Sequence, residues 1–146
     1  MRGIRIFDKK KEKALIGLSE ILEIIKNGAA FNWSILFLDG MPNREYAKEI
    51  VVYEREINSS LNGKIIDWEN LKLLNARFFQ IYETIILGCK DTKLLHRYED
   101  ENEMYRICDI VIELIDCAFW EVYSKDKNLI QTIKHQFNEV ELIELA

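Results

Sequence analysis

Two stretches of alternating apolar and polar residues form the strongest pattern in the chain. The first runs from 107 to 115 and is rich in β-branched residues, which strands favour. The second runs from 119 to 124. Between them, Asp116-Cys117 suits a turn because an aspartate carboxylate can hydrogen-bond to its own backbone. The pattern predicts an antiparallel β-hairpin, although no glycine is present to require a tight primed turn.

The period of the pattern changes directly after this hairpin. Apolar residues recur at spacings of three and four from Leu129 to Phe137, which predicts an amphipathic helix with Ser124 or Asp126 as its N-cap. A hairpin alone is only marginally stable, so we expect this helix to cover it. The remaining residues, 138–146, are predicted to add a last strand or to fray.

Strand and helix patterns also alternate in the first part of the chain. Residues 3–7 predict a short first strand, and the apolar stripe from Leu15 to Ile25 predicts a helix that ends at Asn27-Gly28. Residues 31–38 predict a buried strand. The segment 44–58 has helical spacing but contains a good strand core, and we favour a helix.

The middle of the chain continues this succession. Residues 58–63 have the composition of a loop, 67–75 predict a helix capped by Asp67, and 78–87 predict a long strand. A short helix is expected at 94–98. Consecutive hairpins beside helices indicate an α+β fold, with a mainly antiparallel sheet of about five strands and helices packed on it.

Composition limits the class of protein further. The 146 residues suit a single domain, 1–146, and 49% of them are hydrophobic, enough for a sizeable core. No apolar stretch reaches the roughly 18 residues of a membrane helix, and the start of the chain does not resemble a signal peptide. We therefore expect a cytoplasmic protein that does not associate with a membrane.

The cysteines do not indicate a disulfide framework. Cys89, Cys108 and Cys117 are odd in number and have no CxxC spacing. We predict that they are small buried apolar groups. The tryptophans and most phenylalanines, including Trp33, Trp120 and Phe79, are likewise predicted to be core residues rather than a surface that stacks on nucleic-acid bases.

The net charge of −5 argues against sequence-independent binding of nucleic acid, which needs a cationic surface. The charge is uneven, because residues 1–13 carry six Lys/Arg and two Asp/Glu, a sum of +4, which leaves −9 for the rest. The charge run Lys9 to Lys13 is interpreted as the solvated first turn of a helix, with contact to an acidic partner as the alternative.

The sequence contains no recognisable catalytic, metal-binding or cofactor-binding motif. His96 and His135 lie far apart and lack ligand spacing, and the glycines are scattered singly rather than grouped in a phosphate-binding loop. We therefore predict no catalytic residue, no metal ligand and no cofactor. Asp39 and Asp116 stand at predicted strand ends, where they suit turns. Functional groups of α/β proteins also occur at such ends.

An acidic segment is the candidate binding surface. Residues 98–104 carry a charge of −4 with no basic residue. A solvated loop is one interpretation, and a recognition surface for a basic protein is the other, because clustered carboxylates speed association and select partners by charge. Flanking tyrosines would add contact area. The candidate residues are Tyr98, Glu99, Asp100, Glu101, Glu103 and Tyr105.

Several short motifs resemble a small family of uncharacterised Bacillus-type proteins that share a domain of unknown function. They are Met1-Arg2-Gly3-Ile4, Asn32-Trp33-Ser34-Ile35, a helix that follows Gly63 and leads to Phe78-Phe79, and Tyr123-Ser124-Lys125-Asp126. The resemblance spans most of the chain and is weaker at 44–58 and 91–104. It implies no site residues.

A looser resemblance concerns function. A small acidic α+β chain whose aromatic strand leads into a C-terminal helix is similar to the immunity proteins of bacterial toxin systems. We expect a non-enzymatic protein that binds a basic partner, such as a nuclease toxin. The alternatives are a small-molecule-binding or enzymatic domain with a pocket near Asp39 and Asp116, and a self-associating structural protein. The sequence indicates no oligomeric state.

Overall fold

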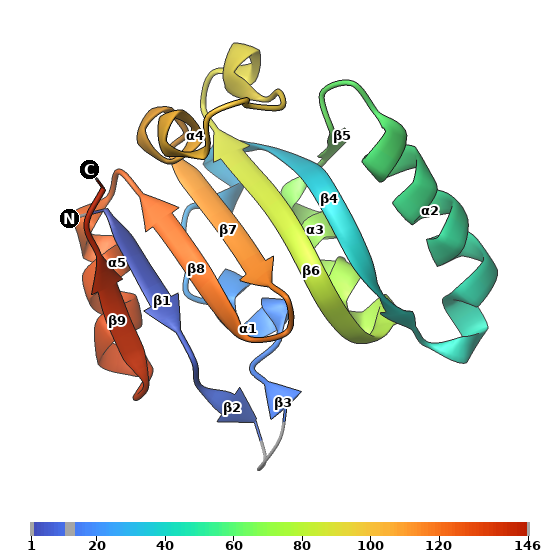
Figure 1. The fold of residues 1–146 in the computed structure, drawn as a ribbon, viewed down its shortest axis with the longest axis horizontal. Coiled ribbons are helices and arrows are strands. Elements are labelled where there is room, and N and C mark those ends of the chain that lie inside the picture. Colours follow the sequence, from blue (N-terminus) through green and yellow to red (C-terminus); the bar gives the residue numbers. More distant parts are fainter. Residues whose placement is uncertain (1, 11–13, 146) are drawn as a thin grey trace.

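A seven-stranded antiparallel sheet forms the centre of the protein (Figure 1). The computed structural model describes residues 2–10 and 14–145. The strands lie in the order β5 (Lys64–Ile66), β4 (Asn32–Pro42), β6 (Phe78–Cys89), β7 (Ile110–Ile115), β8 (Phe119–Ser124), β1 (Gly3–Ile6) and β9 (Val140–Ile143). A separate two-stranded ribbon pairs β2 (Lys9–Lys10) with β3 (Ala14–Leu15).

Five α-helices in the described part surround this sheet. They are α1 (Leu18–Leu22), α2 (Ala47–Ser59), α3 (Trp68–Leu74), α4 (Glu101–Ile107) and α5 (Lys127–Gln136). Short 3-10 turns occur at η1 (Gly28–Ala30), η2 (Arg44–Tyr46), η3 (Asn75–Arg77) and η4 (Thr92–Leu94). The predicted α+β class with an antiparallel sheet is confirmed, and so is the helix expected at 44–58.

The predicted strand number is too low, since the main sheet has seven strands rather than about five. One additional strand is β9, which the sequence left as either a strand or a frayed tail. The other is β5, whose three residues are too few for a periodic pattern. It is a strand because its backbone pairs with residues Trp33 to Ile35 of β4. This pairing joins distant parts of the chain, so the local sequence pattern does not predict it.

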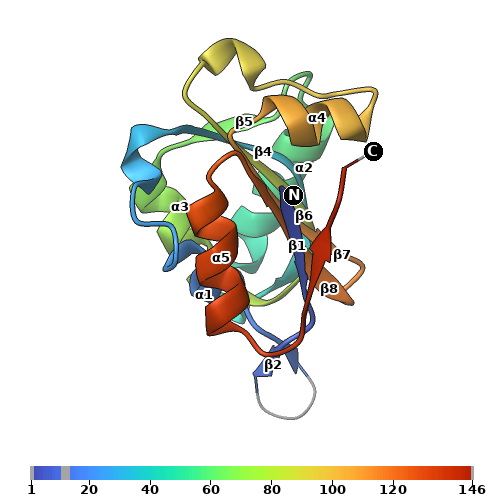
Figure 2. The same ribbon diagram turned by 90° about the vertical axis from the view of Figure 1, so that its left-hand side faces the viewer.

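Most of the hydrophobic core lies between one face of the sheet and the helices α1, α2, α3 and α5 (Figure 2). Alternate residues of each strand point to this face, as a period of two requires. In β7 these are Ile110, Ile112 and Leu114, each at most 4% exposed. Trp33 and Trp120 are buried in this core, as predicted. Phe79 differs, because its side chain is 73% exposed.

A second, smaller core lies on the opposite face. The segment that follows β6 crosses this face at one end and includes α4 (Figure 1). Its Met104 and Tyr105 pack against residues of β6, β7 and β8, including Leu87. Cys89 and Cys108 are buried here, as predicted, whereas Cys117 is exposed in the hairpin turn. The rest of this face carries no helix from the described residues.

The predicted helix over Leu15 to Ile25 is shorter in the structure. The side chain of Glu20 accepts a hydrogen bond from the Gly17 backbone N–H at 2.8 Å, which fixes the start of α1 at Leu18. The predicted first helical turn at Lys9 to Lys13 is wrong for Lys9 and Lys10, which form the exposed strand β2. Residues 11–13 of that charge run lie outside the described residues.

The hairpin between β7 and β8 is confirmed, and its turn has the primed geometry without a glycine. Asp116 and Cys117 have φ of 51° and 57°, and the Ala118 N–H donates to the Ile115 carbonyl. Both central residues therefore occupy the left-handed region, which costs an ordinary L-residue about 1–2 kcal/mol.

Replacing Cys117 with glycine is expected to raise the free energy of unfolding by about 1 kcal/mol, because glycine adopts this conformation without steric cost. The Cys117 side chain is exposed, so little packing is lost. Urea unfolding of the two proteins measures the change. Ala118→Gly is the matched control and should destabilise slightly, since the φ of Ala118 is not positive. A Cys117→Gly variant no more stable than the wild type would contradict the strain argument.

Candidate functional site

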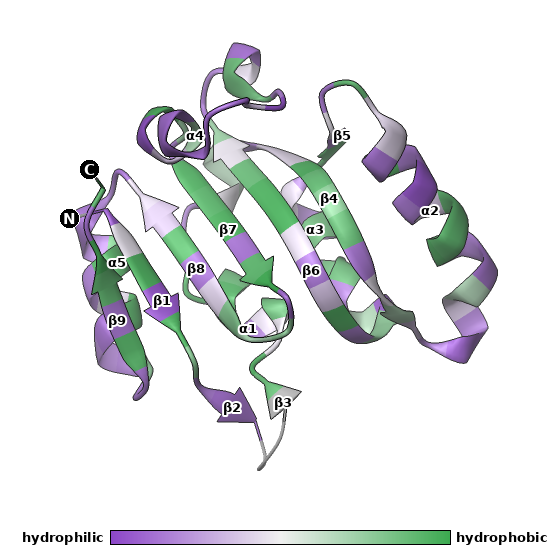
Figure 3. Cartoon of the chain, in the orientation of Figure 1, coloured by the Kyte–Doolittle hydropathy of each residue, from purple (hydrophilic) through white to green (hydrophobic). Residues whose placement is uncertain are grey.

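The candidate site is the part of the sheet face that α4 leaves uncovered. One row of directly paired residues crosses six neighbouring strands here. It contains two apolar residues, three glutamates and one arginine, so the middle of the face is charged. Figure 3 shows a hydrophilic segment in the middle of β7 and another near the end of β1. The row is Phe37 (β4), Ile85 (β6), Glu113 (β7), Glu121 (β8), Arg5 (β1) and Glu141 (β9).

The next row towards α4 is apolar and covered. The ring of Tyr105 in α4 stacks on that of Tyr123 in β8, with ring centroids 3.8 Å apart and an interplanar angle of 9°. A Cβ at Gly3 would lie 2.7 Å from the Tyr123 ring, so only glycine fits beneath it. The two tyrosines thereby fix α4 beside the charged row.

The row on the other side is open to solvent. Asp39 of β4 pairs with Glu83 of β6, and Ile115 of β7 pairs with Phe119 of β8. Burial raises the pKa of the Cys117 thiol, and the nearby charges of Asp116, Glu83 and Asp39 raise it further. The fold therefore gathers Asp39 and Asp116, which are far apart in the sequence, at one end of this face.

We name the carboxylates of this region the acidic face. It combines residues of β4, β6, β7, β8 and β9 with one residue of the hairpin turn and one of α4. Glu101 of α4 belongs to it because its charge raises the pKa of Glu113. The acidic face consists of Asp39, Glu83, Glu101, Glu113, Asp116, Glu121 and Glu141.

Glu121 is buried and fully paired. Its Oε2 accepts from Arg5 Nε at 2.7 Å and lies 2.6 Å from a terminal nitrogen of the same guanidinium. Its Oε1 accepts from the Tyr123 hydroxyl at 2.8 Å. Arg5 also lies 3.6 Å from Glu141 and 4.6 Å from the centre of the Phe119 ring. The positive charge of Arg5 is therefore already engaged by two carboxylates.

Glu113 lies directly opposite Glu121 in the sheet and is only 6% exposed. Its Oε1 is buried and has no hydrogen-bond partner among the described residues. Burial raises the pKa of Glu113 to about 7, and the charges of Glu101 and Glu121 add to the rise, while a hydrogen bond with Tyr105 opposes it. At neutral pH a substantial fraction of this carboxyl group is therefore protonated.

The structure divides the predicted acidic segment into exposed and buried members. Glu99, Asp100, Glu101 and Glu103 are all exposed. Asp100 is the N-cap of α4 and accepts from the Asn102 N–H at 2.9 Å, and Glu101 and Glu103 lie in the first turn. Carboxylates at this position stabilise a helix, so part of the segment has a structural role.

The two flanking tyrosines do not behave alike. Tyr105 is only 7% exposed because its ring stacks beneath α4, so the expectation that it offers exposed contact area is wrong. Tyr98 is half-buried, stacks on His96 and donates its hydroxyl hydrogen to the Leu94 carbonyl at 2.7 Å. The exposed part of the predicted surface is therefore acidic rather than aromatic.

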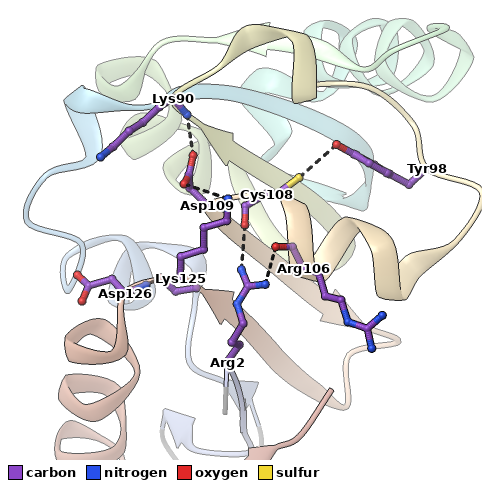
Figure 4. Close-up of polar contacts among 9 residues, drawn as sticks. Arg2, Lys90, Tyr98, Arg106, Cys108, Asp109, Lys125 and Asp126 are labelled. Atoms are coloured by element: carbon purple, nitrogen blue, oxygen red, sulfur yellow. Dashed lines mark hydrogen bonds and ion pairs between the residues drawn. The ribbon is translucent and has the colours of Figure 1, made fainter. Parts of the chain in front are cut away.

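A second polar region lies at the end of β6 and the start of β7 (Figure 4). The Asp109 carboxylate accepts from the Lys90 backbone N–H at 2.8 Å and lies 3.7 Å from the Lys125 ammonium. The guanidinium of Arg2 donates to the carbonyls of Arg106 and Cys108. These contacts join the start of β1, the end of β6, the end of α4 and the end of β8.

No group of three or more histidine, cysteine, aspartate or glutamate side chains within residues 2–10 and 14–145 is arranged to hold a metal ion. The two histidines bond locally, His96 to the Arg97 carbonyl and His135 to the Gln131 carbonyl. No helix in the described part of the chain is long and apolar enough to cross a membrane.

Comparisons of the chain with models of protein families, with curated proteins and with solved structures gave no match. The resemblances noted from the sequence therefore remain predictions.

The sequence pattern did not single out Glu113 and Glu121, the two buried carboxylates of the site. The sequence did contain one sign of them: each of the two apolar strands of the predicted hairpin has a single glutamate among its apolar residues. Such positions normally face solvent. Only the register shows that they are paired with each other, and only the tertiary structure places Tyr105 of α4 beside Glu113 and Arg5 of β1 on Glu121.

Proposed function

We propose that the protein binds a basic protein through the acidic face and inhibits it, as an immunity protein inhibits a nuclease toxin. One observation carries the proposal: seven carboxylates from different strands, a turn and a helix lie together where α4 leaves the sheet uncovered. Arg5 lies among them and is already paired with Glu121 and Glu141.

The chemistry of the face fits a cationic protein surface. Clustered charge of one sign steers an oppositely charged partner and raises its rate of association. Half-buried Phe37, Ile85 and Phe119 lie between the carboxylates and would supply apolar contact. Glu99 and Glu103 would extend the charged surface along α4.

The competing enzymatic or small-molecule function was expected near Asp39 and Asp116. The structure shows cavities of 510 Å³ beside α5 and 520 Å³ between α1 and β6, and neither is lined by these two aspartates. The position of the two aspartates on an open acidic surface supports partner binding instead.

The test compares two variants with the same change in net charge. The face variant is Asp39→Asn, Glu83→Gln and Glu101→Gln, all of which lie on the proposed surface. The control is Glu23→Gln, Glu49→Gln and Glu69→Gln, which are exposed outside the acidic face. Both retain the buried glutamates, so neither is expected to disturb the fold.

Tagged wild-type protein should retain a basic protein from a lysate of the native host at low salt and release it at high salt. With that protein purified, we expect the face variant to associate at least about tenfold more slowly at low salt, and the control to match the wild type. Equal rates for the two variants, or no basic protein retained at either salt, would refute the proposal. Neutralising Glu99, Asp100, Glu101 and Glu103 together tests whether the surface extends along α4.

A further inference from the structure

A cleft of 510 Å³ lies on a different part of the molecule from the acidic face. Its walls are the segment from Ile24 to Phe31, the residues at the end of β6 and the start of β7, and the first turns of α5. This volume lies within the range of about 300–1,000 Å³ that is usual for sites of small organic ligands.

Three lysines line the cleft, although the chain as a whole is acidic. They are Lys26, Lys90 and Lys125. Lys125 has one loose ion pair, with Asp109 at 3.7 Å. Within the described part of the chain, neither Lys26 nor Lys90 has a carboxylate within ion-pair distance. Figure 4 shows the Lys90 side chain extending away from Asp109 while its backbone N–H points to that carboxylate.

The two carboxylates of the cleft are already used by the fold. Asp109 accepts from the Lys90 N–H at 2.8 Å and faces Lys125. Asp126 is the N-cap of α5 and accepts from the Asn128 N–H at 2.8 Å. The three lysines of the cleft therefore outnumber its two carboxylates, and each carboxylate already accepts a hydrogen bond from a backbone N–H.

The remaining lining suits the non-ionic part of a ligand. Ile25, Ile110 and Leu129 provide an apolar floor, and the ring of Phe31 stands at one wall with the Lys90 ammonium 5.8 Å from its centre. Asn128 and Thr132 add polar groups from α5. A few polar groups around an apolar surface are typical of small-molecule sites.

We propose that this cleft binds a small phosphate ester with an apolar or aromatic body. Lysine ammonium groups are compact point charges that bind phosphate, and two or three of them suit a dianion better than a single carboxylate. The apolar floor and Phe31 hold the body of the molecule. The site is independent of the proposed basic partner, since a cationic surface would be repelled by these lysines.

The experiment uses phenyl phosphate and adenosine monophosphate as ligands, at low ionic strength. Phenol and adenosine are the neutral counterparts, and inorganic phosphate tests the charge alone. Amide chemical shifts of the isotope-labelled protein are followed by NMR during titration. We expect at least one ester to bind with a millimolar or lower Kd and to shift the amides of Lys90, Asp109 and Lys125, and the neutral counterparts to bind at least about tenfold more weakly.

Two variants locate the site. Lys26→Gln with Lys90→Gln removes charge from exposed positions without removing an ion pair, and Thr132→Trp fills the cleft while leaving its charges in place. Each should weaken binding of the ester at least about tenfold. Lys134→Gln, an exposed lysine of α5 outside the cleft, is the control and should bind as the wild type does.

Failure of both esters to bind would overturn the inference, and so would binding that is unchanged in the Lys26→Gln, Lys90→Gln variant. Binding of inorganic phosphate as tight as that of the esters would contradict the role given to the apolar floor. None of these results depends on whether a basic protein binds the acidic face.

Discussion

Trp120→Ala is expected to lower the free energy of unfolding by about 4 kcal/mol, which is a large part of the stability of an ordinary domain. Trp120 is 1% exposed, so truncation leaves a cavity that the surrounding core can fill only in part. Its Nε1 also donates to the Ile16 carbonyl at 2.7 Å, and this buried acceptor would lose its partner. The side chain therefore joins β8 to the segment that leads into α1.

Urea unfolding, followed by circular dichroism, measures this change. Phe79→Ala is the matched control, because it also removes an aromatic ring but from a side chain that is 73% exposed, and it should change stability by less than about 0.5 kcal/mol. Trp120→Phe keeps most of the apolar volume and loses the N–H donor, so an intermediate loss is expected. If Trp120→Ala were within about 1 kcal/mol of the wild type, Trp120 would not have the assigned role.

Glu113→Gln is expected to make the protein more stable than the wild type at pH 8, by up to about 3 kcal/mol, and to change its stability little near pH 4. Burial raises the pKa of Glu113 to about 7 in the folded protein, against an ordinary value of 4.5. The folded state therefore holds this proton more tightly than the unfolded chain does. The stabilisation that the protonated Glu113 carboxyl group provides is complete below the ordinary pKa of 4.5, and it is lost as the pH rises through about 7.

Burial sets the sign of this effect, and the groups that face Glu113 change its size. Tyr105 offers a hydrogen bond, while Glu101 and Glu121 oppose ionisation by their charge. Glutamine keeps an oxygen that can accept from Tyr105 and cannot ionise. Free energies of unfolding of both proteins between pH 4 and pH 8 supply the test, with Glu83→Gln as the control on the same face. A difference between Glu113→Gln and the wild type that does not change with pH would contradict the assignment.

An ionised and unpaired Glu113 lowers the stability of the free protein at neutral pH. A cationic group of a bound partner near the acidic face would favour the ionised form and recover part of that loss. If the proposed function holds, partner binding should therefore release protons near pH 7, and the Glu113→Gln variant should release fewer.

The sequence pattern predicts those parts of the fold that depend on local chemistry. The hairpin and α5 follow from a change of period at the capping residue Asp126, which the structure shows as the N-cap. The short helix α4 was not predicted, because the acidic residues that precede it and form its first turn have the composition of a loop. Asp100 caps the start of this helix, and the ring of Tyr105 stacks on the ring of Tyr123 in β8. The stacking is a tertiary contact, which the local sequence pattern does not reveal.

The candidate site is harder to predict for the same reason. The acidic segment near α4 is contiguous and is visible in the sequence. The remaining carboxylates come from strands whose order and register the sequence does not specify. A shift of one residue between β7 and β8 would send Glu113 and Glu121 to opposite faces. The pairing of these two glutamates is therefore a property of the register and not of any motif.

The position of β1 determines when the protein can complete its fold during synthesis. This strand comes from the first residues of the chain but pairs on one side with β8 and on the other with β9. At about 5–20 residues per second, a ribosome needs roughly 6–24 s after making β1 to finish β8. During that time Ile4 and Ile6, which are 0% exposed in the folded protein, lack their partner strands and the helix α5 that packs on β1. We expect the nascent chain to be a substrate for chaperones until β8 and β9 have been made.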